Sequence, residues 1–244
     1  MGSDMKKIDK TYLKRVGSGL LAIFAYFFFS YIETVPFILL GIDVNTLPNS
    51  IKIPYLLIYQ ALLLALIIFI LWDSLKKDIE DIKKNHKTYF KKYFKYWFLL
   101  LGLMMLSNYI ILIIMNLTGN NTMLPENEQI IRSNFQIAPL YMYLTSVAIA
   151  PAMEELVFRR GIRNIIKNDV LFIIVSGFVF GGLHVLLSGT ANPLELLYII
   201  PYSVPGFIFA YILTKTDNVL VDVGLHTFHN GILMSLQFLM MIFM

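Results

Sequence analysis

The chain has 244 residues, of which 57% are hydrophobic and 15% are charged, and its formal net charge is +4. A soluble domain of this size carries about a quarter charged residues, so this composition excludes an ordinary water-soluble fold and indicates a membrane protein. Because cysteine is absent, disulfides, thiol catalysis and thiolate metal sites are excluded as well.

The apolar residues form blocks that are long enough to cross a bilayer as helices. A helix needs about 20 mostly apolar residues to cross about 30 Å of hydrocarbon. The predicted fold is therefore an all-α, polytopic transmembrane helix bundle of about seven spans. These spans are 17–41, 52–72, 97–118, 137–165, 169–188, 194–214 and 218–242.

The connections between the spans are short and differ in charge. Residues 1–16, before the first span, carry five basic side chains, and further basic residues follow the second and fourth spans. The loops 42–51 and 119–136, at the opposite end, carry few. Since cytoplasmic loops are enriched in Lys and Arg, the N-terminus is predicted to be cytoplasmic and the C-terminus to lie outside. The basic charge therefore reports topology, and no nucleic-acid partner is expected.

Residues 73–96 alternate lysines with aliphatic and aromatic residues. The pattern is typical of an amphipathic helix on anionic headgroups, and it fits a solvated basic loop equally well.

The fourth span contains two adjacent carboxylates. Ionisable groups inside apolar spans are costly and are candidate functional residues. Glu155 and Arg159 are four positions apart and are predicted to pair on one helix face. Adjacent helix positions differ by about 100°, so Glu154 points elsewhere, and a buried carboxylate without a partner is a candidate general base. The alternative is a helix end that carries both glutamates to the headgroups.

The fifth span contains His184 deep in an apolar segment. This side chain is either a structural hydrogen-bond donor or a catalytic group. Gly177 and Gly181 are four positions apart and predict a face on which a neighbouring helix approaches closely.

The last span contains two histidines and an amide near its start. His226 and Asn230 share a helix face and could donate hydrogen bonds to one oxygen, as an oxyanion hole requires. His229 lies within reach of that face. The alternative is hydrogen bonding between helices.

A rise of 1.5 Å per residue gives approximate depths from the cytoplasmic end. Glu154 lies at about 18 Å, His226 at about 12 to 14 Å and His184 at about 22 to 24 Å. The three are predicted to line one polar active-site cavity that opens toward the cytoplasm, although His184 lies deeper by a turn or more.

Together the three clusters resemble the intramembrane CAAX protease and bacteriocin-processing family, abbreviated CPBP or Abi. That family has the ordered pattern EExxxR, FxxxH and HxxxN on consecutive membrane segments. The matching residues here are Glu154-Glu155-x-x-x-Arg159, Phe180-x-x-x-His184 and His226-x-x-x-Asn230. The resemblance covers about residues 140–235, and the first three spans are not matched.

The resemblance implies an intramembrane endopeptidase with a glutamate-dependent mechanism. Glu154 and His184 would activate water, and His226 with Asn230 would stabilise the oxyanion. No cofactor is expected, and the alternative is a zinc-dependent protease with Glu154, His184 and His226 as metal ligands. The residues expected to support the site are Glu155, Arg159 and His229.

The implied organisation has three parts: a cytoplasmic flank at 1–16, accessory transmembrane helices at 17–118 and a catalytic transmembrane core at 137–242. The expected substrate is a lipidated protein tail or a membrane-associated peptide. The expected setting is a bacterial cell membrane, because the composition and short loops look bacterial, and a bacteriocin or pheromone precursor is then the more plausible peptide. The alternative is a non-proteolytic scaffold or a bacteriocin self-immunity protein. A transporter is disfavoured because the polar clusters occur only in the C-terminal half.

Overall fold

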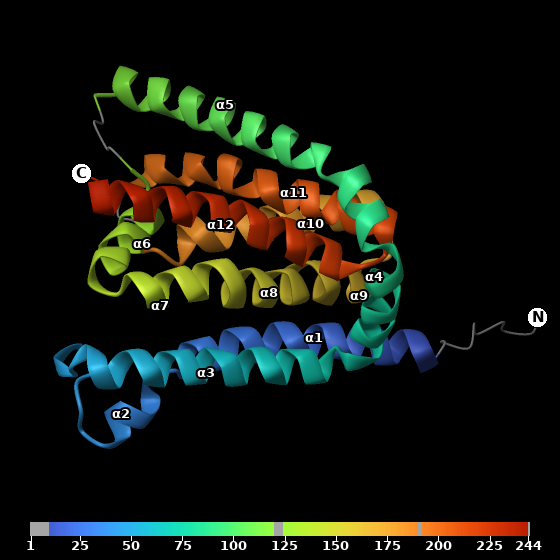
Figure 1. Ribbon diagram of the computed structural model, residues 1–244, viewed down its shortest axis with the longest axis horizontal. Coiled ribbons are helices and arrows are strands. Elements are labelled where there is room, and N and C mark those ends of the chain that lie inside the picture. Colours follow the sequence, from blue (N-terminus) through green and yellow to red (C-terminus); the bar gives the residue numbers. More distant parts are fainter. Residues whose placement is uncertain (1–9, 120–123, 190–191, 244) are drawn as a thin grey trace, which may run out of the picture.

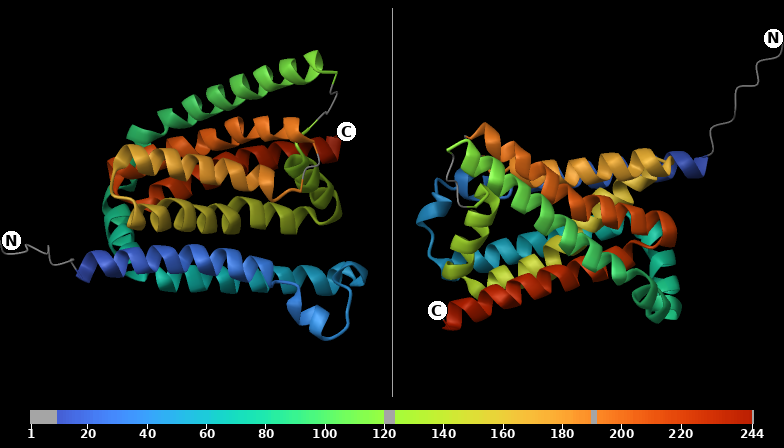
Figure 2. Two further views of the ribbon diagram at one scale, coloured as in Figure 1. Left: turned by 180° about the vertical axis from the view of Figure 1, so that it is seen from behind. Right: turned by 90° about the horizontal axis from the view of Figure 1, so that it is seen from above.

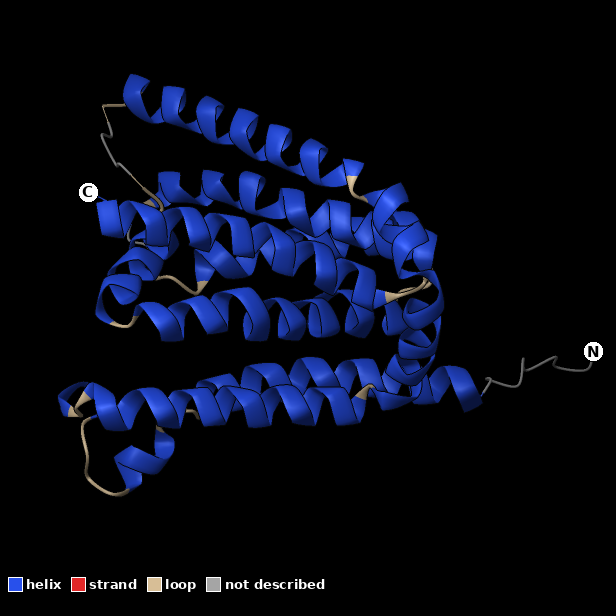
Figure 3. Cartoon of the chain, viewed as in Figure 1, coloured by secondary structure: helices blue, strands red, loops and turns tan. Residues whose placement is uncertain are grey.

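The computed structural model describes residues 10–119, 124–189 and 192–243, and every regular element in those ranges is a helix (Figure 3). The predicted helical membrane bundle is confirmed. Lys6 and Lys7 of the predicted N-terminal flank lie outside the described residues. Five described segments are long and apolar enough to cross a membrane: Lys10–Tyr31, Asn49–Ile70, Lys95–Leu117, Asp169–Leu186 and Pro193–Thr216.

The first two long helices, α1 (Lys10–Tyr31) and α3 (Asn49–Ile70), lie side by side as a separate layer (Figure 1). They carry many large apolar side chains on their exposed surface, as lipid-facing helices do. The predicted first span is broken, because the chain turns at 32–34 before the short α2 (Val35–Leu39) and η1 (Val44–Thr46). These short elements lie at the end of the bundle opposite the first turn of α1 (Figure 1).

The amphipathic segment forms α4 (Trp72–Tyr93), which crosses the end of the bundle between α3 and α5 (Lys95–Leu117) (Figure 1). It buries Leu75, Asp78 and Tyr93, while its lysines stay exposed. The helical alternative for this segment is therefore confirmed. Helix α5 then runs along the far side of the core and diverges from it (Figure 2).

The predicted fourth span is helical from Pro139 to Ile165 but is not a single α-helix. It consists of α7 (Pro139–Leu144), η2 (Thr145–Ile149), α8 (Ala150–Glu155), η3 (Leu156–Gly161) and α9 (Ile162–Ile165). Both η2 and η3 are π-helical. Such wide turns are frequent at functional sites, and here they flank the two glutamates on α8. The preceding α6 (Glu126–Ile137) lies in a segment that the sequence predicted as loop.

The core is completed by α10 (Asp169–Leu186), η4 (Pro193–Tyr198), α11 (Ile199–Thr216) and α12 (Val219–Phe243). Helices α10 and α11 pack closely through glycines, as predicted for Gly177 and Gly181. A Cβ atom on Gly206 would lie 2.7 Å from the Cα of Gly177, and one on Gly181 would overlap the side chain of Ser203. Only glycine allows this approach.

A buried ionic network joins α4 to the core. Arg160 donates from Nη2 to both carboxylate oxygens of Asp78, at 2.9 and 2.7 Å, and from Nη1 to Asp217 at 2.9 Å. Asn218 donates to Asp81 at 2.8 Å. Burial raises the pKa of Asp78, and the charge and hydrogen bonds of Arg160 partly offset this rise.

Candidate active site

The two glutamates of α8 point in different directions, as their adjacent positions require. The side chain of Glu155 is fully buried, whereas that of Glu154 is 18% exposed and lines a cavity. The two carboxylates therefore meet different surroundings, and only Glu154 is accessible to a substrate.

Glu155 and Arg159 form the predicted ion pair, with 3.0 Å between Oε2 and Nε and no exposure of either side chain. Among the described residues, no nitrogen of Arg159 has a hydrogen bond of good geometry. Its guanidinium instead lies 4.3 Å from the ring centre of Phe180 and 5.8 Å from that of Phe209. The aromatic faces thus replace water around this buried cation.

His226 links the two glutamates. Its Nδ1 lies 2.8 Å from Oε1 of Glu155, and its Nε2 lies 3.8 Å from Oε2 of Glu154. Because a carboxylate only accepts, the Nδ1–H of His226 donates to Glu155, and this contact fixes the ring orientation. Nε2 is then directed toward Glu154, at a separation that suits a bridging water better than a direct hydrogen bond.

His184 shares the cavity with Glu154. Its Nδ1 lies 2.9 Å from the carbonyl oxygen of Phe180, and its ring stacks on Tyr202 at 5.2 Å between centroids. A carbonyl oxygen only accepts, so the Nδ1–H of His184 is the donor in this contact. In the neutral ring, Nε2 is then the nitrogen that can accept a hydrogen bond. The depth difference predicted from the sequence does not separate the two side chains.

Asn230 and His229 lie further along α12. The side-chain amide of Asn230 donates to the backbone oxygen of Ser146, at 2.8 Å, and so ties α12 to the π-helical η2. An amide has a second N–H, which remains for another acceptor. His229 is buried, and its Nδ1 has no hydrogen-bond partner among the residues that the structure describes.

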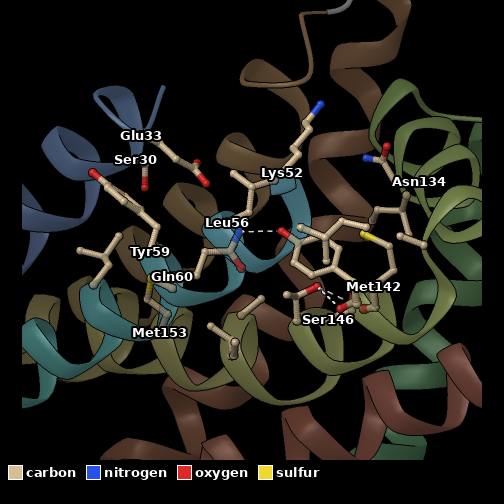
Figure 4. Close-up of a pocket in the computed structure, with 18 of the residues that line it drawn as sticks. Ser30, Glu33, Lys52, Leu56, Tyr59, Gln60, Asn134, Met142, Ser146 and Met153 are labelled. Carbon is tan, nitrogen blue, oxygen red and sulfur yellow. Dashed lines mark hydrogen bonds between the residues drawn. The ribbon is translucent and has the colours of Figure 1, made fainter. Parts of the chain in front are cut away.

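The cavity has a volume of about 560 Å³ and lies between the α1–α3 layer and the segment from α6 to α8 (Figure 4). Its floor includes Glu154 and buried Leu63, and its exposed lining residues include Asn49 and Asn134. These last two lie at the end of the bundle opposite α4 and the basic segments. The lining residues therefore reach the end opposite the basic segments, whereas the sequence predicted an opening toward the cytoplasm; at the basic end, α1 packs against η3 and α9.

Three polar residues near the site were not singled out from the sequence: Tyr202, Ser146 and Asp222. Asp222 is fully buried, one turn before His226 on α12, and neither of its oxygens has a partner among the described residues. Asp222 is an ionisable residue in an apolar span, and this feature of the sequence could have identified it as a candidate. Ser146 acts through its backbone oxygen, which leaves no signal in the sequence.

The zinc alternative stays a prediction, which a chelator can test. Within the described residues, no group of three or more His, Asp or Glu side chains is spaced to hold a metal ion. Nδ1 of His226 contacts Glu155 and Nδ1 of His184 contacts a backbone oxygen, and histidines that bind zinc through their other nitrogen make the same contacts.

Residues 136–232 match the family described as type II CAAX prenyl endopeptidase Rce1-like. The predicted family resemblance is confirmed. The matched Rce1-like segment contains all seven residues named in advance: Glu154, Glu155, Arg159, His184, His226, His229 and Asn230.

Two curated proteins are similar to parts of the chain. One is named "Putative membrane peptidase YdiL", from Bacillus subtilis, with 26% identity over 115 residues, or 46% of this chain and 43% of that protein. The other is an uncharacterized protein of Mycoplasma capricolum, with 37% identity over 92 residues, or 37% of this chain and 25% of that protein. The chain thus spans less than half the length of both relatives. No solved structure matches the chain.

Proposed function

We propose that the protein is an intramembrane endopeptidase in which Glu154 activates the attacking water. The observation that supports this most is the placement of Glu154 on a cavity floor with Nε2 of His226 at 3.8 Å, while Glu155 holds the other nitrogen of that ring. A carboxylate on a cavity and an oriented imidazole beside it are the kinds of group that activate a water for peptide hydrolysis.

The proposed reaction assigns one role to each side chain. Glu154 takes a proton from water, with His184 accepting the second water hydrogen, and the hydroxide oxygen forms a bond to the substrate carbonyl carbon. Two donors, the imidazolium Nε2–H of His226 and the remaining N–H of Asn230, stabilise the oxyanion. The carbon–nitrogen bond then breaks, and Glu154 returns the proton to the leaving amine.

Glu155 has a positioning role in this scheme. Its carboxylate accepts from Nδ1 of His226 and so orients the ring, whose Nε2–H is the donor in this scheme. Arg159 in turn neutralises Glu155. The chain of contacts therefore runs from Arg159 through Glu155 and His226 to Glu154.

The proposed substrates are membrane-associated peptides or lipidated protein tails. From the distribution of Lys and Arg we infer that the basic end of the bundle is cytoplasmic. From the composition and the short loops we infer a bacterial cell. The cavity mouth beside Asn49 and Asn134 would then face outward, which favours a small exported peptide over a cytoplasmic protein tail.

The test is cleavage of lipid-anchored and amphipathic peptides by the purified wild type and by Glu154→Gln, with and without a zinc chelator. The matched control is Glu195→Gln, because Glu195 is a buried glutamate that does not line the cavity. We expect cleavage to be lost only in Glu154→Gln and to be insensitive to the chelator.

Loss of cleavage on chelation, with recovery on added zinc, would replace this mechanism with a zinc-dependent one. Full cleavage by a folded Glu154→Gln would refute the role of Glu154. If this variant keeps the biological effect of the wild type in cells, a scaffold or self-immunity protein is favoured instead.

A further inference from the structure

A second hollow lies at the opposite end of the molecule from the cavity mouth, between α4 and the first turns of α12. It has a volume of about 520 Å³, and none of its lining residues lines the cavity of Glu154. Its floor includes Val221, Gly224 and Leu225, so it is an apolar groove.

The groove exists because α4 and α12 touch at two separate places. At one, Asp78 accepts from the backbone N–H of Val219, at 3.2 Å. At the other, the rings of Phe90 and Phe94 meet Phe228, with centroids 6.5 and 5.3 Å apart. Between these contacts α12 presents Gly224, whose missing side chain deepens the groove, since no atom lies within 4 Å of the position a Cβ would take.

The rim of the groove is basic. His86, Lys87 and Lys91 line it from α4, and no Asp or Glu is among its lining residues. Lys87 and Lys91 are four positions apart, so both ammonium groups lie on one face of the helix, and both are exposed. An apolar floor with two cations at its edge is complementary to an amphiphile with a negative headgroup.

We propose that this groove binds one anionic phospholipid from the surrounding bilayer. An acyl chain covers the apolar floor at Gly224, and the headgroup phosphate lies between Lys87 and Lys91. Helix α4 crosses the bundle end that carries most of the basic residues, where anionic headgroups concentrate (Figure 1). The bound lipid completes the contact between α4 and α12, the helix that carries His226.

The experiment is native mass spectrometry of the detergent-purified full chain, titrated with dioleoyl phosphatidylglycerol or with dioleoyl phosphatidylcholine. We expect one tightly retained phosphatidylglycerol and weaker retention of phosphatidylcholine. The variant Gly224→Phe fills the groove and should abolish the tight site. Lys87→Ala with Lys91→Ala should weaken it about thirtyfold, because each lysine near an anionic surface contributes about a factor of five.

Matched controls use the same changes away from the groove. Gly102→Phe places the same ring on a glycine of α5 that also has open space around it. Lys76→Ala with Lys83→Ala removes two exposed charges of α4 that do not line the groove. Both controls should retain the lipid as the wild type does. Equal retention of the two lipids by the wild type, or unchanged retention by Gly224→Phe, would overturn the proposal, and neither readout depends on peptidase activity.

Discussion

Nδ1 of His226 lies 2.8 Å from Oε1 of Glu155, inside a region where neither side chain is appreciably exposed. The contact joins α12 to α8 and orients the ring whose other nitrogen reaches Glu154. The residue beside the proposed base thus determines the orientation of the histidine on α12. Stability and geometry at this site therefore depend on the same carboxylate.

Replacing Glu155 by Gln should strongly destabilise the protein. The change leaves the guanidinium of Arg159 buried without a counter-charge, and breaking a buried pair in this way costs about 3 to 5 kcal/mol. Thermal unfolding in detergent measures the effect. A midpoint equal to that of the wild type would contradict the structural role of the pair.

The control for Glu155→Gln is Glu128→Gln. Glu128 and Arg132 form an ion pair with the same spacing on α6, at 2.8 Å, but their side chains are 32% and 48% exposed. Exposed pairs contribute at most about 1 kcal/mol, so this variant should unfold close to the wild-type temperature.

Replacing Arg160 by Lys should loosen α4 without unfolding the bundle. Lysine keeps the charge but cannot donate in the planar fork that now reaches Asp78 and Asp217 together. Faster hydrogen exchange in residues 72–93 is the expected result. Arg163→Lys serves as the control, because Arg163 pairs with an exposed Asp169 and does not contact α4. Unchanged exchange in Arg160→Lys would show that other contacts hold α4.

Replacing Gly181 by Ala should destabilise the contact between α10 and α11. The added methyl group would overlap the Ser203 side chain and lie 2.7 Å from the backbone oxygen of Ile199, which cannot move away easily. Overpacking of this kind costs about 1 to 3 kcal/mol. Gly102→Ala, where no atom lies within 4 Å, should be neutral or slightly stabilising in the same unfolding assay. Equal effects of the two variants would contradict the close-packing argument.

The sequence predicted those parts of the fold that depend on local patterns. Blocks of apolar residues located the long helices, and the four-residue spacing of Glu155 and Arg159 located their ion pair. The spacing of Gly177 and Gly181 similarly indicated the close helix contact. In each case one helix face or one run of residues carries the whole signal.

The remaining features depend on contacts between distant segments. The pairing of His226 with Glu155 joins residues 71 positions apart, and that of Arg160 with Asp78 joins residues 82 positions apart. The end of the bundle that the cavity lining reaches also depends on how α1, α3 and α8 pack together, and counting residues along helices cannot show this. The π-helical stretches beside Glu154 also escaped prediction, since apolar periodicity does not distinguish them from α-helix.

Stability in acid should depend on Asp81 at the junction of α4 and α12. Hydrogen bonds from Asn218, then from Tyr89 and Asn85, lower the pKa of this carboxyl. A lowered pKa in the folded state means that the stabilisation is complete above the ordinary aspartate value of about 3.9 and disappears as the pH falls through the lowered value. Thermal unfolding of the wild type and Asp81→Asn should differ at pH 6 and converge in stronger acid. A difference that persists at low pH would contradict the assignment.

Asn230→Ala should reduce catalysis much more than binding, if the proposed reaction holds. Removing one donor to an oxyanion lowers kcat by about 100- to 1000-fold and leaves KM nearly unchanged, because the interaction forms only in the transition state. The amide also donates to the oxygen of Ser146, so a structural effect must be separated from a catalytic one. Asn134→Ala provides the comparison, since Asn134 lines the cavity at its mouth and should affect KM at most. A rise in KM with unchanged kcat in Asn230→Ala would show that Asn230 only fixes η2 against α12.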